Sequence, residues 1–106
     1  MKEEDKIEEI LFDAFNLTHQ EIVCAEFDTL ASGTTANICL LYGNILVCAN
    51  VGDSRSVLFL KDTKANTEWK YSYLSFDHKP DIKEERERIE KENGKVECAV
   101  GFFKIR

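Results

Sequence analysis

The sequence lacks a long hydrophobic run. Its longest apolar stretches, such as residues 45–49, are far too short for a membrane-spanning helix, which needs about 20 apolar residues. The first residues also lack the apolar stretch of a secretory signal peptide, because a charged Met-Lys-Glu-Glu-Asp segment leads into an amphipathic one. These absences predict a chain that does not enter a membrane and that resides in the cytosol or the nucleus.

An excess of positive charge is absent as well. The chain carries 20 acidic and 14 basic side chains, a formal net charge of -6. A protein that binds nucleic acid needs a basic face to neutralise phosphates. The composition therefore argues against a nucleic-acid partner. The acidic runs at residues 3–5 and 84–92 are expected to be solvated helix faces.

Metal-ligand spacing is missing from the cysteines. None of the four forms a Cys-x-x-Cys pair, and they sit among apolar neighbours. In a chain without a secretory signal, such cysteines are expected to be buried, reduced thiols rather than disulfides or zinc ligands. They are Cys24, Cys39, Cys48 and Cys98.

The sequence does have the composition of a small globular domain, with 43% hydrophobic and 32% charged residues. Over residues 6–15 the apolar positions recur at helical spacing, which predicts a helix with one buried stripe. Thr18 and Glu21 have the spacing of a capping box. A second short helix is therefore expected to begin after residue 17 and to carry its own apolar side chains toward the core.

Two apolar runs flank a Gly-Asn dipeptide at residues 43–44, which predicts a β-hairpin with a two-residue turn. Counting back from the turn places Cys39 opposite Cys48 and Asn37 opposite Asn50 on one face. Both faces are largely apolar, so each must be covered by helices or by a second sheet. The two runs are residues 36–42 and 45–51.

Further strands are expected downstream of this hairpin. A tight turn at residues 52–55 leads into a strand at 56–60. A polar loop at residues 62–67 then separates it from a strand at 69–74. The chain therefore continues as antiparallel strands.

A charged helix is expected to begin at Asp81. Its acidic side chains precede basic ones at the favourable i, i+4 spacing, in the pairs Glu84–Arg88 and Glu87–Lys91. A glycine after these pairs suits the C-terminal cap of the helix, and strand character then resumes toward the end of the chain.

Three segments together carry a resemblance to a known family. They are SGTTA at residues 32–36, ANVGDSR at 49–55 and LSFDHKP at 74–80, followed by ERI at 87–89 and NGKV at 93–96. In their order and spacing they resemble the protein phosphatase 2C (PP2C) family of metal-dependent Ser/Thr phosphatases. None of these strings is specific alone, but all of them occur in order over about 65 residues.

The resemblance implies an α+β fold in which two antiparallel sheets pack face to face between helices, as a four-layer α/β/β/α sandwich. It also implies a pair of Mn²⁺ or Mg²⁺ ions at one edge, bound mainly by carboxylates and waters. A metal-activated water would attack the phosphorus of phosphoserine or phosphothreonine. The expected partners are therefore phosphoprotein substrates.

Asp53 is the one residue to which a family role carries over. It stands in the Gly-Asp-Ser-Arg segment and is similar in position to the acidic residue that helps to hold a third, weaker metal ion in the family. A carboxylate in a turn at a strand end suits a hard cation. The alternative interpretation is an Asx-type turn, in which the carboxylate bonds to nearby backbone amides.

Other polar residues of these segments are expected to be structural. Ser32, Thr34 and Thr35 lack a partnering base and do not match a phosphate-binding loop, so they are expected to lead into a strand. Arg55 is expected to brace its turn. His78 is expected to organise its loop, because the family's catalytic histidine belongs to an Asp-Gly-His-Gly-Gly segment that this sequence does not contain.

The departures from the family pattern indicate a partial domain. The sequence contains neither the Asp-Gly-His-Gly-Gly segment nor the later Asp-Gly and Asp-Asn metal ligands. Residues 1–106 are therefore expected to be the central part of a PP2C-like domain, incomplete at both ends and catalytically silent alone. Uncovered sheet edges would favour self-association. The rival interpretations are a non-catalytic pseudophosphatase scaffold for protein interactions and an α+β binding domain unrelated to phosphatases.

Overall fold

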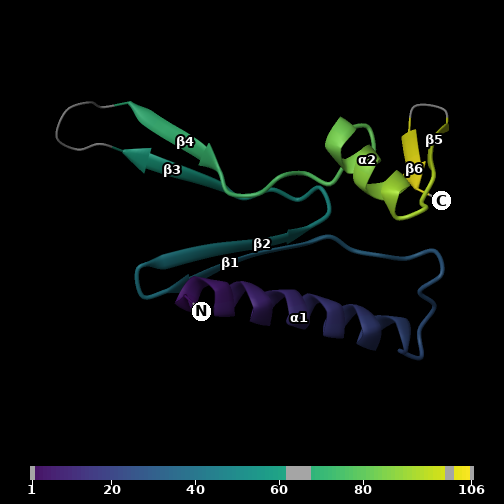
Figure 1. Ribbon diagram of the computed structural model, residues 1–106, viewed down its shortest axis with the longest axis horizontal. Helices are drawn as coiled ribbons and strands as arrows, with labels where there is room; N and C mark the ends of the chain where they lie inside the picture. Colours follow the sequence, from purple (N-terminus) through teal and green to yellow (C-terminus); the bar gives the residue numbers. More distant parts are fainter. Residues whose placement is uncertain (1, 62–67, 100–101, 106) are drawn as a thin grey trace. The chain divides into compact units, whose positions relative to one another are not determined.

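The computed structural model describes residues 2–61, 68–99 and 102–105. It divides into two compact units, residues 1–76 and 77–106, each of which combines a helix with antiparallel strands (Figure 1). This content confirms the expected α+β class, whereas the four-layer packing of the sheets stays a prediction. Within the described ranges, no helix is both long and apolar enough to cross a membrane.

The first unit begins with a long helix, α1, over Glu3–Val23. Near its start the Asp5 carboxylate accepts a hydrogen bond from the Lys2 N–H at 3.0 Å. The prediction of a second helix beginning after residue 17 is wrong, because α1 continues without a break. The Thr18 hydroxyl donates to the Ala14 carbonyl at 2.8 Å, as hydroxyls do inside helices, and therefore caps no new helix.

A β-hairpin follows, with β1 over Ala36–Tyr42 and β2 over Ile45–Val51. The predicted register is confirmed, with Cys39 paired to Cys48 and the other pairs as counted from the turn. Gly43 has a φ of 58°, the left-handed region that the first residue of such a turn requires and that glycine adopts without strain.

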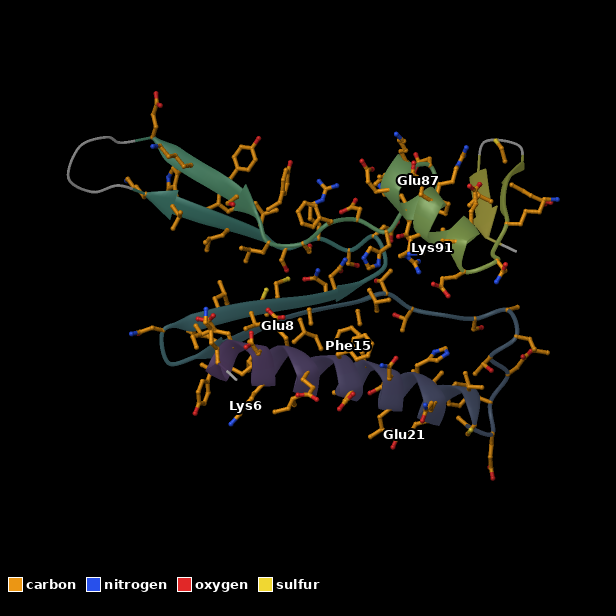
Figure 2. The ribbon with its side chains drawn as sticks, viewed as in Figure 1. Lys6, Glu8, Phe15, Glu21, Glu87 and Lys91 are labelled. Atoms are coloured by element: carbon orange, nitrogen blue, oxygen red, sulfur yellow. The ribbon has the colours of Figure 1, made fainter. Side chains whose placement is uncertain are left out.

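The helix α1 packs along β2. Its half-buried apolar side chains include Ile7, Leu11 and Phe15, whose four-residue spacing forms a single helical stripe. Figure 2 shows the Phe15 ring directed toward the β1–β2 hairpin, whereas Lys6 and Glu21 point away from it. The predicted buried stripe is therefore formed only in part, because Ile10 and Ala14, which share its spacing, are exposed.

A groove of about 380 Å³ remains between α1 and β2. Val47, Ala49 and Val51 line it from the strand and share one face of the hairpin, because side chains alternate along a strand. On the opposite face Leu41 and Leu46 remain exposed. The expectation that both faces are covered is therefore wrong for this chain by itself.

A second hairpin completes the first unit, with β3 over Val57–Lys61 and β4 over Trp69–Tyr73. Both strands confirm the prediction to within a residue at each end. Phe59 and Tyr71 face each other across the pair, and their ring centres lie 6.4 Å apart. The predicted loop at residues 62–67 lies outside the described residues.

The second unit contains α2 over Lys83–Lys91, β5 over Val96–Ala99 and β6 over Phe102–Ile105. β5 and β6 form an antiparallel pair, and α2 packs against β5. The helix was expected to begin at Asp81 but begins after Ile82, which adopts an extended conformation. The prediction of a charged helix followed by strand structure is therefore confirmed, with a small shift of its start.

The end of α2 depends on a close approach between Ile89 and Gly94. Ile89, at 4% exposure, is a buried apolar side chain of this unit. The Gly94 N–H donates to the Ile89 carbonyl at 2.8 Å, and a Cβ added at Gly94 would lie 2.6 Å from the Ile89 Cγ2. The predicted role of a glycine in the helix cap is therefore met, while Asn93 adopts the left-handed conformation, with a φ of 62°.

The structure pairs the charges along α2 differently from the prediction. Arg88 bonds to Glu85 rather than to Glu84, and Glu87 pairs with Lys83 at 3.7 Å. The Glu85 carboxylate accepts two hydrogen bonds from the Arg88 guanidinium, and such a two-pronged contact is stronger than a single ionic approach. The i, i+4 spacing alone therefore predicted Glu84 as the partner of Arg88, whereas the partner is Glu85.

The cysteines are less buried than the sequence predicts. All four are free thiols, but Cys24, Cys39 and Cys98 are exposed and Cys48 is half-buried. The expectation of buried thiols is therefore wrong for this chain. Burial depends on the elements that cover a strand or a helix, and apolar neighbours in the sequence do not identify those elements.

Candidate functional site

The turn between β2 and β3 carries Asp53, which the sequence singles out as a metal ligand. Asp53 is exposed and lies two residues after β2 ends. Gly52, directly before it, has a φ of 101°, a conformation that residues with side chains rarely adopt. The structure therefore presents a solvent-facing carboxylate on a turn whose backbone depends on glycine.

Thr35 contacts this turn from the residue before β1. Its hydroxyl oxygen lies 2.7 Å from the Ser54 hydroxyl oxygen, a hydrogen bond across the two segments. Its methyl carbon is so close to Gly52 that a Cβ added there would lie 2.3 Å away. Thr34 donates to the Thr35 carbonyl at 2.9 Å. The Ser-Gly-Thr-Thr segment therefore leads into a strand, as predicted, and also supports the turn.

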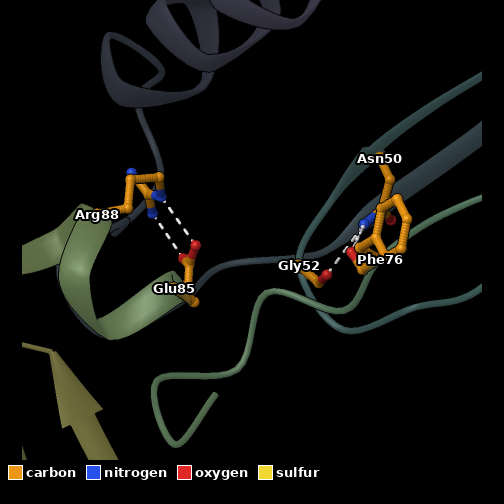
Figure 3. Close-up of polar contacts among 5 residues, drawn as sticks. All are labelled: Asn50, Gly52, Phe76, Glu85 and Arg88. Atoms are coloured by element: carbon orange, nitrogen blue, oxygen red, sulfur yellow. Dashed lines mark hydrogen bonds and ion pairs between the residues drawn. The ribbon is translucent and has the colours of Figure 1, made fainter. Parts of the chain in front are cut away.

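The side-chain amide of Asn50 holds the turn from the end of β2. Its Nδ2 donates to the carbonyl oxygens of Gly52 at 3.2 Å and Phe76 at 2.9 Å (Figure 3). Its Oδ1 accepts a hydrogen bond from the Asn37 Nδ2 at 2.8 Å. One side chain therefore joins the turn, the neighbouring strand and the segment after β4.

Asn37, Asn50, Ser56 and Ser75 form one hydrogen-bonded group, here called the asparagine–serine cluster. Ser75 is 6% exposed, and its hydroxyl accepts bonds from the Ser56 N–H at 3.0 Å and the Asn37 Nδ2 at 3.2 Å. The Ser56 hydroxyl donates to the Asn37 Oδ1. Because buried polar groups are costly unless they are paired, this cluster fixes the β1–β2 hairpin to the start of β3 and the end of β4.

Arg55 supports the same turn from its far end. Its guanidinium carbon lies 5.1 Å from the centre of the Tyr73 ring on β4, within cation–π range. The contact joins the turn to the second hairpin. This agrees with the prediction that Arg55 braces the turn.

In the second unit, Glu85 on α2 has a perturbed pKa. Hydrogen bonds from Arg88 lower the pKa of Glu85 below its ordinary value, burial acts against them, and the nearby charges of Arg88 and His78 lower it further (Figure 3). His78 itself is exposed, and its neighbours Asp77 and Lys79 pair at 3.5 Å. These contacts support the helix and its leading loop, while the loop-organising role of His78 stays a prediction.

The comparison with known proteins agrees with the sequence motifs around Asp53. The family model for protein phosphatase 2C matches residues 1–103 of the chain. The chain belongs to the protein phosphatase 2C family. No solved structure gives a significant match.

Several curated PP2C proteins are similar to this chain. Protein phosphatase 2C 1 of Paramecium tetraurelia is 46% identical over 69 residues, which cover 65% of this chain and 21% of that protein. Probable protein phosphatase 2C 61 of Arabidopsis thaliana is 45% identical over 69 residues, which again cover 65% of this chain and 21% of that protein. Probable protein phosphatase 2C 2 of Paramecium tetraurelia is 38% identical over 105 residues, 88% of this chain and 33% of that protein. The chain therefore spans about a fifth to a third of these PP2C relatives.

The PP2C family implies metal ions, and the described residues do not assemble a site for a metal pair. Among them, no three His, Cys, Asp or Glu side chains gather as metal ligands would. Mg²⁺ requires near-octahedral oxygen coordination, which a single carboxylate with water supplies only weakly. The described part of this PP2C chain therefore does not form a metal site by itself, and the metal role of Asp53 stays a prediction.

Sequence reasoning did not identify the asparagine–serine cluster of this PP2C chain. Its hydrogen bonds join residues as many as 38 positions apart, from Asn37 to Ser75. One signal was present, because the predicted register sets Asn37 opposite Asn50 between otherwise apolar residues. Facing amides in such surroundings are expected to bond to each other and to nearby backbone. Ser75 carries no comparable signal.

Proposed function

We propose that this chain is the central part of a Mn²⁺- or Mg²⁺-dependent protein Ser/Thr phosphatase. The family match over residues 1–103 carries the proposal. The complete protein would hydrolyse phosphoserine and phosphothreonine in phosphoprotein substrates, in the cytosol or the nucleus. The 106 residues alone are catalytically silent, because they contain one family-matched metal ligand and lack the Asp-Gly-His-Gly-Gly segment.

Asp53 is the residue to which we assign a metal role within this chain. Its support is positional, since the carboxylate is exposed and follows a strand end. The Thr35 contact and the Asn50 hydrogen bonds hold the backbone of the turn next to Asp53, so the position from which its side chain extends is fixed. A fixed carboxylate loses less conformational freedom when it meets a hard cation than one on a loose loop does.

The test is the substitution Asp53→Ala in the complete protein, with a phosphothreonine peptide as the substrate and Mn²⁺ as the varied component. We expect turnover to fall roughly 10-fold, the scale on which substitutions at metal sites lower affinity or activity. Asp13→Ala, at an exposed acidic position on α1, is the matched control and should leave turnover unchanged. Equal activity of the Asp53→Ala protein and the Asp13→Ala protein at every Mn²⁺ concentration would contradict the role of Asp53.

A second candidate function is a non-catalytic scaffold that binds other proteins. The observation in its favour is the number of large apolar side chains at the surface, among them Phe12, Leu41 and Phe76. The same experiment separates the two functions. A complete protein without metal-dependent hydrolysis at millimolar Mn²⁺ would favour the scaffold, whereas hydrolysis that requires Mn²⁺ would exclude a purely structural role.

A further inference from the structure

Two cysteines face each other across the first hairpin. Cys39 on β1 pairs with Cys48 on β2, and paired positions of an antiparallel ladder place their side chains on the same face. Val47, Ala49 and Val51 of the other face line the groove beside α1, and Cys48 also borders it. The pair plays no part in the metal role assigned to Asp53, so its chemistry is independent of the proposed function.

The position of the pair along the hairpin brings the two backbones close. Tyr42 and Ile45 flank the two-residue turn and form a hydrogen-bonded pair, and the pair type alternates with each step away from the turn. Cys39 and Cys48 are three steps away and therefore form a non-hydrogen-bonded pair. Such pairs have Cα atoms about 4.5 Å apart, within the range of roughly 4.4 to 6.8 Å that disulfides span.

The next pair of the same type supports this close approach. Asn37 and Asn50 lie two further steps along the ladder, and their side-chain amides are joined by a hydrogen bond of 2.8 Å. Side chains on this face of the hairpin therefore meet across the strands. The same geometry applies to the two thiols.

The thiols differ in access and share one polar neighbour. Cys39 is exposed, and its thiol donates to the Ser56 hydroxyl oxygen at 3.3 Å. Cys48 is half-buried, and burial raises the pKa of its thiol, while a hydrogen bond with Ser56 lowers it and the Cys39 thiol raises it. Cys48 thus interacts directly with Cys39, and Cys39 is the sulfur that solvent reaches more readily.

We propose that Cys39 and Cys48 form a dithiol site that hydrogen peroxide converts into a cross-strand disulfide. The Cys39 sulfur attacks the peroxide, the O–O bond breaks, and a sulfenic acid and one water are formed. The Cys48 sulfur then attacks the Cys39 sulfur, the S–O bond breaks, and the hydroxide leaves as water with the Cys48 proton. Two thiols are oxidised by two electrons in all, and one peroxide is reduced to two waters.

Oxidation also changes the asparagine–serine cluster. The Cys39 thiol loses its proton, so its hydrogen bond to Ser56 is lost. Ser56 is the cluster member that bonds to both Asn37 and Ser75. Oxidation therefore removes one hydrogen bond to this cluster member.

The test is peptide mapping of the 106-residue chain after treatment with hydrogen peroxide under native conditions. Trypsin leaves both cysteines in one peptide, because no lysine or arginine stands between them, whereas chymotrypsin cleaves after Tyr42 and separates them. We expect the chain to lose the mass of two hydrogen atoms and the two chymotryptic peptides to be linked. Separate sulfenic or sulfinic acids on Cys39 and Cys48, or a disulfide that involves Cys24 instead, would overturn the proposal.

A trivalent arsenical provides a second readout that needs no oxidation. Phenylarsine oxide bonds to two adjacent thiols with release of one water, so the chain should bind one equivalent. Cys39→Ser and Cys48→Ser should each abolish binding. Cys24 is also exposed but lies outside the hairpin, so Cys24→Ser should retain binding. Binding that survives in the Cys39→Ser chain would contradict the dithiol. Mapping of the unsubstituted chain decides the question even where a variant does not fold.

Discussion

At Gly52 the backbone takes a conformation that excludes most other residues, and the space beside it is filled. Its φ is 101°, and an added Cβ would lie 2.3 Å from the Thr35 Cγ2 and 2.8 Å from the Thr35 Cβ. We predict that Gly52→Ala destabilises the first unit by about 1 to 3 kcal/mol, the cost of a residue held in a sparsely populated conformation. Urea unfolding, monitored through the NMR signals of residues in β1 and β2, measures this loss of stability.

Gly33 is the matched control for that substitution. It lies in the segment before β1, and a Cβ added there would meet nothing within 4 Å. Gly33→Ala should therefore change the free energy of unfolding by only a few tenths of a kcal/mol. Equal losses for Gly33→Ala and Gly52→Ala would mean that Thr35 does not close over the turn.

Single residues were only partly predictable from the sequence. The turn at Asp53 follows from a local Gly-Asp pattern, and the bracing role of Arg55 was predicted with it. The partner of Arg55, Tyr73 on β4, was not predicted, because it is 18 residues away in the sequence. The exposure of Cys39 does not, because it depends on which element covers that face of the hairpin. Ser75 was missed for a related reason, since its partners Asn37 and Ser56 come from distant parts of the chain.

Among the elements, α2 offers a clear pH test. The pKa of Glu85 is lowered, chiefly by its hydrogen bonds from Arg88, so the folded state favours the ionised carboxylate. The stabilisation is therefore present at neutral pH and is lost as the pH falls through the folded-state pKa, below roughly pH 4 where an ordinary glutamate takes up its proton. We predict that Glu85→Gln weakens α2 by roughly 0.5 to 1 kcal/mol at pH 7, a modest loss because Arg88 faces solvent.

Glu87→Gln is the control on the same helix. Glu87 and its partner Lys83 are both exposed and 3.7 Å apart, so this substitution should have little effect at either pH. Unfolding of α2 followed by NMR at pH 7 and at pH 3 gives both comparisons. An effect of Glu85→Gln that is as large at pH 3 as at pH 7 would show that packing, and not charge, accounts for it.

The hairpin β1–β2 was the element most fully predicted, and α1 was the least. A two-residue turn fixes every pair of a hairpin, so the register followed from the Gly-Asn dipeptide alone. The capping-box spacing of Thr18 and Glu21 gave a false helix start, because the Thr18 hydroxyl bonds back to Ala14 within a continuous helix. A cap can be recognised only when the backbone in front of it leaves the helix.

At the scale of the whole molecule, large apolar side chains remain at the surface. Leu30 is 98% exposed, Phe76 85% and Leu41 71%. Exposed apolar area favours association, and unpaired strand edges add backbone groups that can pair with another chain. We predict that the isolated chain self-associates in a concentration-dependent way, which sedimentation velocity measures. A stable monomer at high concentration would contradict this expectation.

We propose that these residues are part of a metal-dependent phosphatase and supply Asp53 without the rest of its metal site. Hydrolysis of a phosphate monoester is among the slowest uncatalysed reactions, and one carboxylate cannot provide the charge stabilisation that it needs. The most direct measurement is hydrolysis of a phosphothreonine peptide by the purified 106-residue chain at millimolar Mn²⁺. The predicted result is no turnover, with at most weak Mn²⁺ binding that Asp53→Ala removes. Robust Mn²⁺-dependent hydrolysis that Asp53→Ala leaves unchanged would contradict both the missing-ligand argument and the role of Asp53.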